Sequence, residues 1–166
     1  LTSQNFAASG STRTIGANTV CWKDTASINN CTDFRYGWYA NLSSSTVNST
    51  TVYEQIIYSP IIATGAFIFN TTLPGINTPT SCTTSKASGW TFALDPSTGA
   101  GLKGFFSGNS SDTVGYALAL NATGSPAVVN VQGQPVLITK TASGTASTTK
   151  LYPSGRGSRI NWIQLR

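Results

Sequence analysis

The stretch "SGWTFALDPSTGAGL" (residues 88–102) decides how the fold is interpreted. Large apolar side chains at Trp90, Phe92 and Leu94 alternate with smaller ones, and the segment "DPSTG" (95–99) then interrupts the alternation. A period of two residues is typical of a β-strand, and a Pro- and Gly-containing polar segment after it indicates a turn. We therefore expect Trp90 and Phe92 to pack inside a sheet rather than to form a ligand platform.

The turn has its own chemistry. The Asp95 carboxylate can accept backbone N–H groups as an Asx turn, Pro96 presets φ, and Gly99 suits the left-handed position. The sequence therefore predicts that Asp95, Pro96 and Gly99 form a structural turn, and that Asp95 is not a catalytic acid.

The same arrangement of strands recurs along the chain. "SPIIATGAFIFNTT" (59–72) and "SPAVVNVQGQPVLITKT" (125–141) each place two apolar runs around a Gly-containing turn, Thr64-Gly65 and Gln132-Gly133. Each stretch predicts a β-hairpin. The strand of residues 90–94 follows the first hairpin. After the second we expect a loop, "ASGTASTTK" (142–150), a turn at 153–155 and a strand, "RINWIQL" (159–165).

We therefore expect an all-β protein built from antiparallel four-stranded blades, with repeat units near 52–102 and 118–166. Further strands are expected at 14–22, 34–42, 51–60 and 115–120, about nine in all. Residues 1–166 would form a single β domain of about two to three blades, whereas a closed β-propeller has about four to eight. The chain is then an incomplete arc or C-terminal fragment of a propeller, or a set of strands rearranged into a sandwich or completed by a partner. Open sheet edges would attract strand pairing.

Composition indicates an extracellular protein. Of the 166 residues 9% are charged, whereas 21 are Ser and 25 are Thr. The net charge of +5 reflects few acids, and the basic residues are scattered, which argues against nucleic-acid binding. No apolar run approaches the ~20 residues of a membrane span. Residues 1–4 have the character of a mature or trimmed start without a signal peptide.

Three cysteines and a group of aromatics are candidate functional residues. Cys21 and Cys31 bracket a polar loop and predict a local disulfide, which leaves Cys82 free or paired outside the chain. With no His in the chain, a zinc site is not expected. Trp38 and Tyr39, with Tyr36 nearby, offer rings for stacking on a sugar, but packing beside the disulfide is the preferred interpretation.

The aromatic strand that runs into Leu-Asp-x-x-Thr-Gly resembles the blade of pyrroloquinoline-quinone-type propellers. Over residues 18–166 the order of features resembles the C-terminal end of the PilY/PilC-type proteins, the tip adhesins and biogenesis factors of bacterial type IV pili. These features are the paired cysteines, Gly37-Trp38-Tyr39, the Tyr58-Ser59-Pro60 hairpin with Phe67-Ile68-Phe69 and Thr71-Thr72, the loop with Cys82, Gly89-Trp90, Ala93-Leu94-Asp95, Thr98-Gly99, and Gly155-Arg156 … Ser158 … Trp162 … Leu165-Arg166.

The resemblance implies a β-propeller module at a pilus tip, exported through the periplasm, that helps pili emerge against retraction. Its partners would be minor pilins and a host or abiotic surface, with strand pairing to the rest of the propeller or to another copy. Members of this family carry an acidic calcium loop, but here the segment "SGNSSDTVGY" (107–116) has one acid, Asp112. Calcium takes about six to eight oxygen ligands, so we expect no calcium and no other cofactor.

Two alternatives stay open beside a non-catalytic adhesion module. The chain could be an extracellular filament subunit that assembles through exposed strand edges. Less favoured is a fragment of a quinoprotein-type enzyme, because the chain has no His and its five acids are widely spaced: Asp24, Asp33, Glu54, Asp95 and Asp112. Glu54 is expected to point outward from a strand, and no catalytic set is expected.

Overall fold

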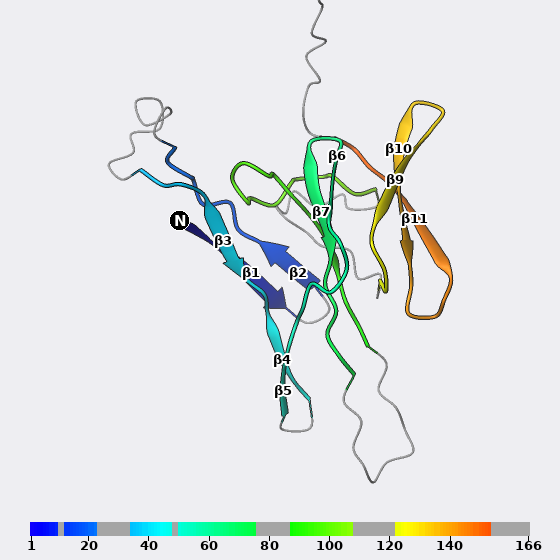
Figure 1. Ribbon diagram of the computed structural model, residues 1–166, viewed down its shortest axis with the longest axis horizontal. Helices are drawn as coiled ribbons and strands as arrows, with labels where there is room; N and C mark the ends of the chain where they lie inside the picture. Colours follow the sequence, from blue (N-terminus) through cyan, green and yellow to red (C-terminus); the bar gives the residue numbers. More distant parts are fainter. Residues whose placement is uncertain (10–11, 23–33, 48–49, 76–86, 108–121, 154–166) are drawn as a thin grey trace, which may run out of the picture.

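The structure is a computed structural model that describes residues 1–9, 12–22, 34–47, 50–75, 87–107 and 122–153. Within these ranges the chain has eleven strands and no helix, which confirms the expectation of an all-β protein. Three small sheets lie side by side, and a two-stranded hairpin projects from the first of them (Figure 1). Among the described residues no helix could cross a membrane.

The first sheet has the strand order β2-β1-β3. It consists of β1 (Thr2–Ser9), β2 (Thr12–Ile15) and β3 (Trp38–Asn41). β1 pairs antiparallel with β2, with Phe6 opposite Ile15, but it pairs parallel with β3. The expectation of purely antiparallel pairing is therefore wrong here, because the segment between β2 and β3 is long enough to cross over. β1 was missed because Phe6 is its only large apolar residue.

The other upstream strands are shorter than expected. The predicted strand 14–22 ends at Ile15, and 34–42 is reduced to β3. The projecting hairpin pairs β4 (Ser44–Val47) with β5 (Thr50–Tyr53), so that only the start of the predicted strand 51–60 is extended. The predicted strands 115–120 and 159–165 lie outside the described residues.

The central sheet contains the first predicted hairpin and the strand from which the sequence argument began. β6 (Ile61–Ala63) and β7 (Ala66–Asn70) flank Thr64 and Gly65, whose φ angles are +52° and +78°. Positive φ at both central residues is the signature of a type I′ turn, whose twist matches the flanking strands. β8 (Thr91–Leu94) pairs antiparallel with β7, with Phe92 opposite Phe69. The predicted hairpin and strand are confirmed.

The third sheet repeats this arrangement. β9 (Ala127–Val131) and β10 (Gln134–Lys140) flank Gln132 and Gly133, with φ of +51° and +82°, and this hairpin too is confirmed. The third strand is β11 (Ala146–Lys150), antiparallel to β10. It lies in a stretch expected to be a loop, and that expectation is wrong. Thr is a good strand former, and alternate residues of β11 are half-buried.

A proline inside β10 is accommodated by its neighbour. Pro135 has no N–H to donate, although Leu151 N donates to its carbonyl oxygen at 2.9 Å. The Gln134 side-chain Nε2 instead donates to Leu151 O at 2.6 Å. The amide therefore replaces the hydrogen bond that a backbone N–H at position 135 would make.

The central sheet is covered on both faces. Towards the first sheet it presents Phe67, Phe69, Phe92 and Leu94, which pack with Phe6, Ile15 and Trp38. Towards the third sheet it presents the smaller Ala66 and Ala93 with Ile68, which pack with Phe105, Phe106, Leu137 and Leu151. Successive residues of a strand point to opposite faces, so the continuous apolar run of β7 supplies both cores.

Because one isoleucine of the first hairpin is buried and another is exposed, we expect the same substitution to lower stability strongly at the first position and hardly at all at the second. Ile68 is 0% exposed and Ile62 is 71% exposed. Ile68→Ala should lower the free energy of unfolding by about 2–5 kcal/mol, because it leaves a cavity between the sheets. Ile62→Ala should change it by less than about 0.5 kcal/mol. Urea unfolding followed by tryptophan fluorescence measures both, and equal losses would contradict the layered arrangement.

Candidate functional site

The Asp95–Gly99 turn has the predicted geometry. Asp95 Oδ1 accepts hydrogen bonds from Ser97 N at 2.7 Å, Ser97 Oγ at 2.5 Å and Thr98 N at 3.2 Å. Gly99 N donates to Asp95 O at 2.8 Å, and Gly99 has φ of +69°. The carboxylate therefore organises its own loop, as expected of a structural rather than a catalytic acid.

Two side chains from the first sheet hold this turn. Trp38 Nε1 donates to Pro96 O at 3.0 Å, and its indole lies so close to Gly99 that any Cβ there would overlap the ring. The buried Gln4 donates through Nε2 to Thr98 O at 2.8 Å and to Asn18 O at 2.7 Å. The turn is thus attached to the first sheet as well as to β8. No pattern in the sequence distinguishes Gln4 from any other polar residue of a strand.

The candidate binding aromatics do not form one platform. Trp38 packs against the first core, in agreement with the preferred interpretation. Tyr39 is 44% exposed and follows Trp38 on the same strand, so the two rings point to opposite faces. Tyr36 is 90% exposed, so the expectation that it packs in a core is wrong. Stacking of Tyr39 on a sugar stays the alternative interpretation.

Cys21 is disulfide-bonded. Cys31 and Cys82 lie outside the described residues, so the Cys21–Cys31 pairing stays a prediction. Arg35 N donates to Cys21 O at 2.8 Å, which ties the region before β3 to the cysteine.

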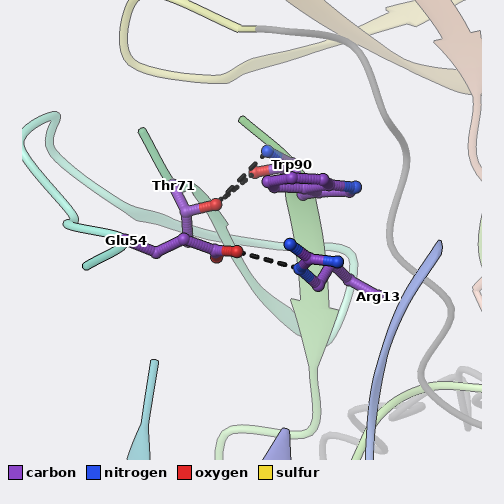
Figure 2. A network of polar contacts seen from close by, with 4 residues as sticks. All are labelled: Arg13, Glu54, Thr71 and Trp90. Carbon is purple, nitrogen blue, oxygen red and sulfur yellow. Dashed lines mark hydrogen bonds and ion pairs between the residues drawn. The ribbon is translucent and has the colours of Figure 1, made fainter. Parts of the chain in front are cut away.

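A buried ion pair lies between the first and central sheets (Figure 2). Arg13 Nε donates to Glu54 Oε1 at 2.9 Å, and the two side chains are 5% and 1% exposed. The expectation that Glu54 points outward is wrong. Val52 of β5 is half-buried, and Glu54, two residues later, lies on the same inward side of the chain.

The rest of the network compensates for only part of the buried charge. The Arg13 guanidinium carbon lies 4.0 Å from the centroid of the Trp90 ring, a cation–π contact. Thr71 Oγ1 accepts a hydrogen bond from Trp90 N at 3.2 Å and so fixes the strand that carries the ring. Glu54 Oε2 is buried and accepts no hydrogen bond in the described part of the chain. The inward direction of the Arg13 side chain could have been predicted, because Arg13 is two residues before the apolar Ile15 and alternate residues of a strand share a face.

An apolar hollow of about 190 Å³ opens between the first and central sheets. Ile56 is its one exposed wall residue, with 43% of its surface accessible, and the other walls are half-buried or buried. The walls carry no charged side chain and come from β1, β3, β7, β8 and the loops that follow β3 and β5. They are Phe6, Trp38, Ala40, Leu42, Ile56, Phe67, Phe69 and Leu94.

The described residues thus provide three features: packed apolar cores, a buried ion pair and the apolar hollow. Within these ranges no three acidic or cysteine side chains gather in a way that could hold a metal ion. Comparisons of the chain with models of known protein families, with curated proteins and with solved structures found no match.

The effect of the Trp38–Gly99 contact on stability can be measured by comparing Gly99 with a second glycine of similar φ. Gly99 and Gly104 have similar φ, +69° and +63°, but a Cβ at Gly104 would meet nothing within 4 Å. Gly104→Ala should cost about 1–2 kcal/mol of unfolding free energy, the cost of a left-handed alanine. Gly99→Ala should cost about 1–3 kcal/mol more, because it overpacks against the indole. Equal losses in chemical denaturation would show that Trp38 does not hold the turn.

Removing one partner of the ion pair should lower the stability of the protein more than replacing both partners with apolar residues. Arg13→Met leaves the Glu54 charge buried without its partner and should cost about 3–5 kcal/mol of unfolding free energy. The double variant Arg13→Met/Glu54→Met removes both charges and should regain most of that loss. Denaturation of both variants at low and high salt provides the measurement. A loss below about 1 kcal/mol for the single variant would contradict burial of the pair.

Proposed function

We propose that this chain is a non-catalytic adhesion and pilus-assembly module of the type IV pilus tip, built from β-propeller blades. It is exported through the periplasm and works at the cell surface. Minor pilins anchor it, and a host or abiotic surface is its target. The blades are four-stranded, and they meet the rest of the propeller or another copy through strand pairing.

The observation that carries this proposal is the face-to-face stacking of two sheets with the same strand order. The central and third sheets each consist of a type I′ hairpin followed by a third antiparallel strand. Blades of a propeller bury themselves in this way, each against the next. The Leu-Asp-x-x-Thr-Gly turn follows β8, and this motif is part of the resemblance to the PilY/PilC-type proteins on which the proposal also rests.

In the described ranges there are two acids, Asp95 and Glu54, and their positions favour a binding role over catalysis. Asp95 is engaged in its own turn and Glu54 in a buried ion pair. Neither carboxylate faces the hollow. In the proposed role the protein therefore recognises a surface and transforms no substrate.

The proposal predicts a piliation defect that depends on retraction. In the bacterium that encodes the chain, deletion of its gene should remove type IV pili from the surface and reduce attachment to cells and plastic. Deletion of the retraction ATPase in the same strain should restore pili, because the module opposes retraction. Electron microscopy and an attachment assay measure both effects, with the wild-type gene returned as the control. Normal piliation and attachment in the deletion strain would overturn the proposal.

A second experiment tests the quinoprotein alternative. The purified protein, incubated with pyrroloquinoline quinone, calcium and a panel of alcohols and sugars, should not reduce a redox dye. Sustained turnover would replace the adhesion proposal with an enzymatic one.

A filament subunit is the second candidate, and strand β9 favours it. Among the described strands β9 is at an edge of the third sheet; it carries no charged residue, and Val129 and Val131 are exposed. Uncharged, apolar edges are the kind that pair with other chains. Regular fibres of the purified protein in negative stain would favour this candidate, and monodisperse particles would favour the tip module.

A further inference from the structure

The apolar hollow between the first and central sheets has no role in the adhesion proposal. Its walls belong to the core that joins these sheets, yet the core leaves about 190 Å³ unfilled there. Protein interiors normally pack with few voids larger than a water molecule. A hollow of this size is therefore a candidate ligand site.

The size of the hollow fits one six-membered ring. A dry cavity of about 150 Å³ lined by aliphatic and aromatic side chains is enough to bind benzene. The hollow is somewhat larger, and Ile56 is its one exposed wall residue, so a ring with a small polar substituent directed to solvent beside Ile56 also fits.

The walls select for an aromatic ring. Phe6 and Phe69 both contact the ring of Phe92, at centroid distances of 5.0 and 5.3 Å, and Phe67 lies 5.4 Å from Phe69. These distances fall within the usual range for aromatic pairs, about 4.5–7 Å. Because Phe6, Phe67 and Phe69 line the hollow, a bound ring would extend an aromatic cluster that already exists.

The walls also select against charge. No lining side chain is ionisable, and the one polar group among them, Trp38 Nε1, already donates to Pro96 O at 3.0 Å. A charged ligand would lose its hydration without a partner. The ligand is therefore uncharged, with its polar atom, if any, at the solvent-facing end.

We propose that this hollow binds an uncharged monocyclic aromatic compound, with the ring against Phe6, Phe67 and Phe69 and the substituent beside Ile56. This inference does not depend on the pilus-tip proposal, because it rests only on the walls of the hollow.

Benzyl alcohol is a suitable probe, titrated into the purified protein and followed by NMR. The methyl signals of Ala40 and Ile56 should shift in a saturable way, with a dissociation constant on the order of 1 mM. Cyclohexylmethanol, its saturated counterpart, should bind several-fold more weakly. The absence of saturable shifts up to about 20 mM benzyl alcohol, or equal affinity for the two compounds, would overturn the proposal.

Adjacent isoleucines provide a matched control. Ile56 lines the hollow, whereas Ile57 does not and is 56% exposed. Ile56→Ser should weaken binding by about 3–10-fold, because it removes one apolar wall, and Ile57→Ser should leave it unchanged. An equal effect of the two substitutions would mean that the probe binds nonspecifically to apolar surface, and would overturn the proposal.

A variant that fills the hollow provides a further test of the site. Ala40→Leu places a larger side chain in the hollow and should abolish binding while near-UV circular dichroism stays unchanged. Undiminished binding by a folded Ala40→Leu protein would overturn the proposal. If this variant does not fold, the comparison of Ile56→Ser with Ile57→Ser still decides the question.

Discussion

The described part of the molecule depends on one constraint: the central sheet is apolar on both faces and must be covered on both. Phe67 and Phe92 face one neighbour, and Ala66 and Ala93 face the other. Left uncovered, either face would expose a contiguous apolar surface to water, which is unfavourable in proportion to its area. The first and third sheets are therefore required for the hairpin that carries β7 to be stable. The asymmetry of the two faces, large rings on one side and methyl groups on the other, lets Phe105 and Phe106 reach the smaller face.

Hydrophobic packing alone does not fix how the first sheet docks. Its position depends on a few polar contacts in a chain with few charges: Gln4 and Trp38 on the Asp95–Gly99 turn, and Arg13 on Glu54 and Trp90. These contacts are directional, whereas apolar contacts are not. A buried charge that loses its partner is costly, so the pair disfavours alternative packings of the two sheets, even if it adds little net stability.

The sequence predicted those features that are encoded locally. The hairpins at Thr64-Gly65 and Gln132-Gly133, the strand after Trp90 and the Asx turn each depend on neighbouring residues, and turn chemistry and alternation identify them. Features that depend on distant partners were missed. The parallel pairing of β1 with β3 and the inward position of Glu54 follow from contacts across 36 or more positions of the chain. β11 was missed because Ser and Thr occur in loops and strands alike, and only pairing with β10 decides between them. The hollow lies among four strands of two sheets and two loops, and no pattern in the sequence predicts it.

The side-chain amide of Gln134, which takes the place of the N–H that Pro135 lacks, has a consequence for strand alignment. If β11 slid along β10 by one residue, the carbonyl at position 151 would leave the reach of Gln134 and a different carbonyl would face the proline ring. Neither oxygen would then find a donor from the backbone at that point. Pro135 in the middle strand therefore favours one alignment of β11 and makes shifted alignments unfavourable. The Ser and Thr side chains of β11 would by themselves tolerate several alignments.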